Sequence, residues 1–125
     1  MTSPSFADKH QRWAYEEQKQ NVSLEMELAK EYRQSWDRGS KEDRNAVLAF
    51  IYDKRCKEGF DLIVTALYED EDLASEAAAV ASGLIYHDYD LGPNIKIALE
   101  QFGRKHPRWA NISQFALELL DARQR

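Results

Sequence analysis

Hydrophobic residues recur every three or four positions along most of the 125-residue chain, which is the spacing of one face of an α-helix. No sustained alternation of apolar and polar residues is present, and no Asn-Gly, Asp-Gly or Gly-Gly pair marks a β-hairpin turn. The five glycines and three prolines fall mainly where helices are expected to end or begin. The pattern predicts an all-α protein of six or seven short antiparallel helices.

The first 20 residues carry the weakest apolar pattern. From about Phe6 to Gln20 the chain is rich in Gln, Glu and Lys, and Trp13 is its main apolar anchor. We expect residues 1–20 to form a loosely docked helix or arm in which Trp13 is not fully buried.

The remaining helices are predicted between residues 21 and 125, each with an apolar stripe. Asn21 or Ser23 is expected to cap the first of them, and Ser40 with Asp43 three positions later resembles a capping box. Helix ends are expected at Gly39, Gly59, Tyr68, Gly92-Pro93 and Pro107. The predicted inward residues are Met26, Ala29, Tyr32 and Trp36; Val47, Leu48, Ile51, Tyr52 and Cys56; Ile63, Ala66 and Leu67; Leu73, Ala77, Val80, Ala81 and Leu84; Ile95, Ala98, Leu99 and Phe102; and Trp109, Ile112, Ala116, Leu119 and Leu120.

The composition of the chain limits the classes of protein to which it can belong. A chain of 125 residues with 43% hydrophobic and 31% charged residues is expected to form one all-α domain over residues 1–125. The single cysteine, Cys56, excludes an internal disulfide and a cysteine-rich zinc site. The longest near-apolar run, residues 73–86, is too short to cross a bilayer, and residues 1–5 lack the features of a secretory signal. We therefore expect a cytoplasmic protein that does not enter a membrane.

Candidate catalytic chemistry is sparse. The chain has no Gly-rich phosphate loop, no Gly-x-Ser-x-Gly and no Glu-x-x-His, and Cys56 is interpreted as a core residue. The His87-Asp88 pair resembles part of a metal-dependent phosphohydrolase site, but only His10 and His106 remain as further imidazole ligands. We expect no enzyme, no cofactor and no metal, with a small metal-dependent hydrolase as the least favoured hypothesis.

Negative charge is concentrated in the middle of the chain. Between Glu58 and Ile95 there are nine acidic residues and no Lys or Arg. The turns at 69–72 and 87–90 are expected at opposite ends of one helix, about 20 Å apart. Their side chains either cap helices and line a solvated face or, with neighbouring tyrosines, bind a basic protein. The residues predicted to contact that partner are Tyr68, Glu69, Asp70, Glu71, Asp72, Tyr86, Asp88, Tyr89 and Asp90. Free nucleic acid is not expected as a partner, because such a surface repels phosphate.

The stretch from Leu67 to Leu84 resembles the core of a HEAT-like repeat. In such repeats an Asp-containing acidic turn joins two antiparallel helices, and the second helix opens with a run containing Ala-Ala. The chain departs from the pattern at Ser75-Glu76, where many repeats carry Arg. The resemblance implies helical hairpins stacked as in HEAT-like repeats, and an irregular helical bundle is the alternative architecture.

Small acidic bacterial proteins that resemble this chain include immunity proteins that neutralise secreted toxins. The resemblance therefore implies a non-enzymatic protein-binding module, and the acidic stretch favours a nuclease-type toxin as its partner, since carboxylates can mimic phosphates. The alternative hypothesis is an adaptor or inhibitor subunit of another assembly.

Overall fold

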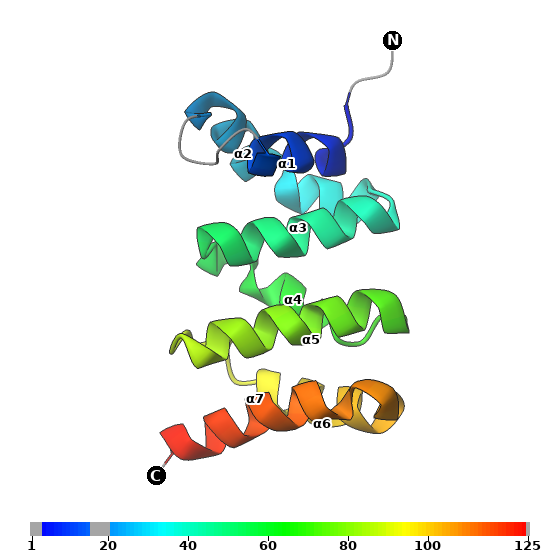
Figure 1. The fold of residues 1–125 in the computed structure, drawn as a ribbon, viewed down its shortest axis with the longest axis vertical. Helices are drawn as coiled ribbons and strands as arrows, with labels where there is room; N and C mark the ends of the chain where they lie inside the picture. The colour runs from blue at the N-terminus through cyan, green and yellow to red at the C-terminus, as the bar shows by residue number, and fades with distance from the viewer. Residues whose placement is uncertain (1–3, 16–20, 125) are drawn as a thin grey trace. The chain divides into compact units, whose positions relative to one another are not determined.

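The computed structural model describes residues 4–15 and 21–124, and in these ranges the chain forms seven α-helices and no β-strand (Figure 1). The helices are α1 (Phe6–Tyr15), α2 (Val22–Arg38), α3 (Lys41–Lys54), α4 (Phe60–Ala66), α5 (Glu71–Tyr86), α6 (Ile95–Lys105) and α7 (Ala110–Arg123). Short 3-10 turns, η1 (Lys57–Gly59) and η2 (Pro107–Trp109), precede α4 and α7. The all-α prediction is confirmed. None of these described helices has the length and apolar composition needed to cross a membrane.

The chain divides into two compact units, residues 1–55 and residues 56–125. The first unit contains α1, α2 and α3, and the second contains α4 to α7. The expectation of one domain over residues 1–125 stays a prediction.

An aromatic cluster around Phe50 holds the first unit together. Phe50 lies on α3 with no exposed surface, and its ring centroid lies 6.0 Å from that of Phe6 and 5.5 Å from that of Trp13, both on α1. Tyr32 of α2 lies 6.2 Å from the same ring. One residue of α3 therefore contacts both other helices of the unit, through ring pairs of the kind that stabilise protein cores.

Helix α1 is packed along its length. Trp13 is only 1% exposed, so the expectation that it would be partly buried is wrong. Lys9 adds ion pairs from α1 to α2, with its Nζ 2.6 Å from Glu27 Oε1 and 2.9 Å from Glu31 Oε2. The hydrogen bonds to Glu27 and Glu31 raise the pKa of Lys9. The described part of the expected N-terminal arm is thus a docked helix, and residues 1–3 and 16–20 lie outside the described residues.

The apolar stripe of α2 is displaced from its expected phase. Leu24, Leu28, Tyr32 and Trp36 are buried, at intervals of four residues, whereas Met26 is 56% exposed and Ala29 is exposed. Tyr32 and Trp36 were predicted correctly, but Met26 and Ala29 were not. Leu24 and Leu28 are buried because, at spacings of four residues, they lie on the same side of the helix as Tyr32 and Trp36.

Local capping determines several helix ends. Asn21 Oδ1 accepts a hydrogen bond from Leu24 N (3.1 Å), and Ser40 and Asp43 form the reciprocal capping box at the start of α3. Helix α3 ends at Lys54 and not near Gly59, because Arg55 adopts a left-handed conformation with φ of 53°. Gly59 instead lies buried in η1.

In the second unit, two helical hairpins place α5 and α7 in parallel (Figure 1). Near the starts of these helices, Trp109 Nε1 donates to Glu71 Oε1 at 2.9 Å. At their ends, the guanidinium of Arg123 donates to the carbonyl oxygens of Ile85 and Tyr89. Parallel helices from successive hairpins are what stacked helical repeats contain. The HEAT-like assignment itself stays a prediction.

The core of this unit follows the predicted stripes on α5 and α6. Leu73, Ala77, Val80, Ala81 and Leu84 are buried on α5, as are Ile95, Ala98, Leu99 and Phe102 on α6. The stripe predicted for α7 is less deeply buried, because Ala116 is buried whereas Trp109, Ile112, Leu119 and Leu120 remain partly exposed. Helix α7 contacts both α5 and α6, and its fully buried residues are the small Ser113 and Ala116, while its larger apolar side chains border the surface.

Helices α6 and α7 cross closely at Gly103 and Ser113. A Cβ atom placed on Gly103 would lie 2.7 Å from Ser113 Oγ but 3.8 Å from Ser113 Cβ. Ser113 is 3% exposed, and its Oγ donates to the Ala110 carbonyl oxygen at 2.9 Å. The hydroxyl of Ser113 is therefore the atom that excludes a larger residue at position 103.

We expect Gly103→Ala to lower the free energy of unfolding by about 1–3 kcal/mol, since overpacking at this crossing outweighs the better helix propensity of alanine. Adding Ser113→Ala should recover most of that loss, because the clashing Oγ is removed. Urea denaturation of the two single variants and the double variant measures the coupling. Additive effects of the two substitutions would contradict the close crossing.

Candidate functional site

The whole net charge of −5 belongs to the second unit. Residues 56–125 contain twelve acidic and seven basic residues, whereas residues 1–55 contain ten of each. All nine acidic residues of the stretch between Glu58 and Ile95 lie in this unit, and all but the half-buried Glu69 are exposed. The predicted contact residues therefore belong to a unit with a strong negative field.

The first acidic turn contributes to the fold as well as to the surface. Asp70 is the N-cap of α5, and its Oδ1 accepts a hydrogen bond from Leu73 N at 3.2 Å. Glu71 accepts the bond from Trp109, which joins the starts of α5 and α7. Asp72 is exposed in the first turn of α5, and Tyr68, just before the turn, is 48% exposed. Asp70 and Glu71 thus have a role in the fold, and Asp72 and Tyr68 are also exposed at this end of α5.

The second acidic turn is a tight loop between α5 and α6. Asp88 has a φ of 67°, and its Oδ1 lies 3.5 Å from Nη2 of Arg123 on α7. Asp90 Oδ1 accepts a hydrogen bond from Gly92 N at 2.8 Å, and Gly92 has a φ of 93° that suits glycine. Tyr89, between them, packs edge-on against Phe60 of α4, with ring centroids 6.1 Å apart.

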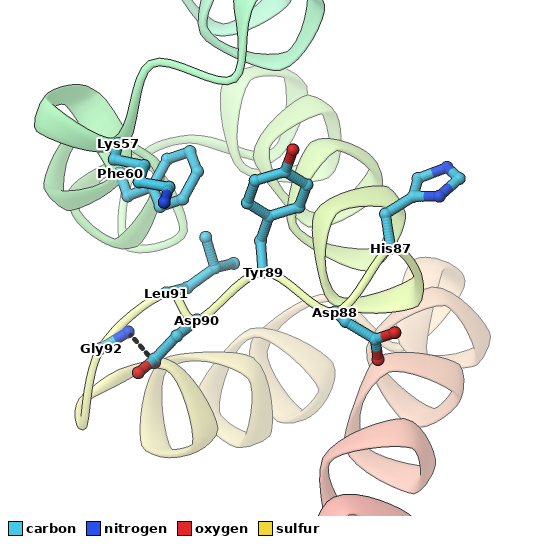
Figure 2. A pocket seen from close by; sticks show the side chains of 8 residues that line it. All are labelled: Lys57, Phe60, His87, Asp88, Tyr89, Asp90, Leu91 and Gly92. Carbon is cyan, nitrogen blue, oxygen red and sulfur yellow. Dashed lines mark hydrogen bonds between the residues drawn. The ribbon is translucent and has the colours of Figure 1, made fainter.

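This loop forms one wall of a pocket of about 560 Å³ (Figure 2). Figure 2 shows the rings of Phe60 and Tyr89 next to each other in their edge-on arrangement, with Leu91 beside them, while His87 and Asp88 point away from Lys57 and Phe60. The pocket is lined by Lys57, Phe60, His87, Asp88, Tyr89, Asp90, Leu91 and Gly92. Apolar side chains (Phe60, Leu91), Tyr89 and charged side chains (Lys57, Asp88, Asp90) contribute to the same lining.

The structure brings together some of the predicted contact residues and separates others. Asp88, Tyr89 and Asp90 line one pocket, but Tyr68 and the turn at 69–72 lie at the other end of α5. With 16 residues, α5 is about 24 Å long. The expected separation of the two turns is confirmed, so contact with both requires a partner surface that spans the helix.

The sequence pattern did not predict that Lys57 and Phe60 line this pocket. Phe60 follows the helix end expected at Gly59, and it lies 29 positions before Tyr89. No local pattern links the two rings, because the α4–α5 hairpin alone brings them together.

The metal hypothesis at His87-Asp88 gains no support from the geometry. Within residues 4–15 and 21–124, no three or more His, Cys, Asp or Glu side chains are grouped so that they could hold a metal ion. The His87 ring packs edge-on against Tyr86 at 5.2 Å, and the Asp88 carboxylate pairs with Arg123.

The capping role of Asp70 can be separated from its charge. We expect Asp70→Ala to lower the free energy of unfolding by about 1 kcal/mol, and Asp70→Asn to have a much smaller effect because asparagine also caps helices. Urea denaturation followed by circular dichroism measures both. Glu76→Ala is the control, since Glu76 is an exposed mid-helix carboxylate of α5. Equal losses for Asp70→Ala and Asp70→Asn would show that charge, and not the cap, matters.

No protein-family model, no curated protein and no solved structure matches this chain.

Proposed function

We propose that the chain is a non-enzymatic immunity protein that binds a nuclease-type toxin through the acidic surface of its second unit. The observation that supports this most directly is the division of charge: the first unit is neutral, and the second carries twelve acidic against seven basic residues. We place this activity in the cytoplasm, because a protein with the single cysteine Cys56 needs no oxidising compartment.

A concentrated negative field suits a basic partner. Nucleases hold phosphates with positively charged side chains, and carboxylates presented on a rigid helical unit can occupy the same positions. Complementary fields raise the association rate by one to three orders of magnitude at low salt. The exposed Asp72 and Asp88, at opposite ends of α5, are placed to contribute to such steering.

Exposed tyrosines supply the contact area that carboxylates lack. Tyr68 is 48% exposed and Tyr86 is 62% exposed, one before and one at the end of α5. Tyrosine is enriched among residues that dominate interface energies, because its ring buries much surface at a low entropic cost. An interface of about 800 Å² per partner is roughly 30 Å across, so one partner can reach from Tyr68 to Tyr86.

The test uses the gene that lies directly upstream, which for an immunity protein encodes the toxin. We expect the C-terminal domain of that gene product to arrest growth when expressed alone, and co-expression of this chain to restore growth. Absence of both protection and binding would contradict the immunity proposal, and capture of a different partner would favour the adaptor hypothesis.

The acidic surface has its own test by stopped-flow association kinetics with the same toxin domain. We expect Asp72→Asn with Asp88→Asn to slow association about tenfold at low ionic strength, with the difference shrinking in high salt. Asparagine keeps the left-handed conformation of residue 88 accessible.

The matched control is Asp37→Asn with Glu42→Gln, which removes the same number of charges from exposed positions of the first unit. Association that slows equally in the control and in the Asp72/Asp88 variant would show that net charge, and not this surface, steers the partner.

A further inference from the structure

Two large aromatic rings lie stacked at the surface of the second unit. Tyr86 is 62% exposed at the end of α5, and Phe115 is 48% exposed on α7. Their ring centroids are 6.4 Å apart, and the ring planes are inclined by 27°. The parallel packing of α5 and α7 brings these residues together across 29 positions of sequence.

The stack is a pre-formed contact surface. Phenylalanine is among the residues most often buried, so a half-exposed Phe stacked on an exposed Tyr marks an apolar patch that a partner can cover. Each ring restricts the other, and the His87 ring adds an edge contact to Tyr86 at 5.2 Å. Side chains that are ordered before binding lose less entropy when a partner arrives.

The helices that carry the stack are acidic. Helix α5 contains Glu71, Asp72 and Glu76 and no basic residue, and α7 contains Glu118 and Asp121. The one basic residue of these two helices, Arg123, already pairs with Asp88 and the carbonyl oxygens of Ile85 and Tyr89.

Helix α6 has the opposite balance of charge, because Lys96, Arg104 and Lys105 outnumber Glu100. Lys96 lies 3.9 Å from Asp121 of α7, and Glu118 of α7 accepts a hydrogen bond from Gln114, so both carboxylates have a partner within the unit. The stack nevertheless lies on two helices that each carry net negative charge.

We propose that the Tyr86–Phe115 stack is the anchor site for an arginine side chain of a basic protein partner. A guanidinium is planar and weakly hydrated, so it can lie on an aromatic face while its N–H groups bond to a carboxylate. Glu118 lies three residues after Phe115, on the same side of α7 one turn further along. The inference specifies the partner chemistry of the proposed function, and its test does not need the toxin.

The experiment compares two blocked peptides of equal charge, hexa-arginine and hexa-lysine, by NMR titration of the full chain. We expect the arginine peptide to bind about two- to fivefold more tightly and to shift the ring resonances of Tyr86 and Phe115. Equal affinities, or shifts confined to other residues, would overturn the proposal.

The variant that tests the site is Phe115→Ala, which changes no charge and removes a half-exposed ring. It should abolish the preference for arginine while leaving the affinity for hexa-lysine unchanged. Ile97→Ala on α6 is the matched control, because Ile97 is 55% exposed and should be without effect. Circular dichroism verifies that each variant is folded, and Tyr86→Phe, which keeps the ring, should retain the preference.

The outcomes separate this inference from the proposed function. An arginine preference that depends on Phe115, without protection from the toxin, would retain the anchor site and refute the immunity role. If the chain protects cells from the toxin but binds hexa-arginine and hexa-lysine equally well, the anchor site is refuted and the immunity role is retained.

Discussion

The parallel packing of α7 on α5 is the contact on which the second unit depends. It is possible because α5 presents alanine where larger residues would hold the neighbouring helices apart: Ala74, Ala77, Ala78 and Ala81 have no exposed surface. Close approach then allows direct links between the two helices, including the bond from Ser82 Oγ to the carbonyl oxygen of Ile112. The same approach brings Tyr86 against Phe115 and Arg123 to the end of α5. A core contact and a surface feature thus have one physical cause.

Several acidic residues of this unit have a defined role in the fold. Asp70, Glu71 and Asp90 accept hydrogen bonds from Leu73 N, Trp109 Nε1 and Gly92 N, so they hold a helix start, a helix pair and a turn. Asp72 and Asp88 are exposed as well, and Asp88 also pairs with Arg123 of α7. A structural role and exposure therefore coincide in this stretch, and recognition of a basic partner by these carboxylates stays a proposal.

The first unit provides a contrast within the same chain. Its charges balance, and the ion pairs of Lys9 with Glu27 and Glu31 connect α1 to α2. Phe6, Trp13 and Tyr32 lie around Phe50 in its interior, although Tyr15 is 89% exposed, whereas in the second unit Tyr86 and Phe115 stack at the surface. Because the first unit has no net charge, the proposed binding of a charged partner rests on the second unit.

The sequence by itself determined the features that depend on neighbours a few positions apart. The Ser40 capping box, the Asp70 cap and the buried stripes of α5 and α6 were all predictable, because capping and helical periodicity act within one or two turns. Tertiary structure decided the rest. The burial of Trp13 depends on Phe50 of a different helix, and the exposure of Met26 depends on which side of α2 the other helices cover. The Phe60–Tyr89 and Tyr86–Phe115 pairs each join residues 29 positions apart, and only the packing of helices brings such residues into contact.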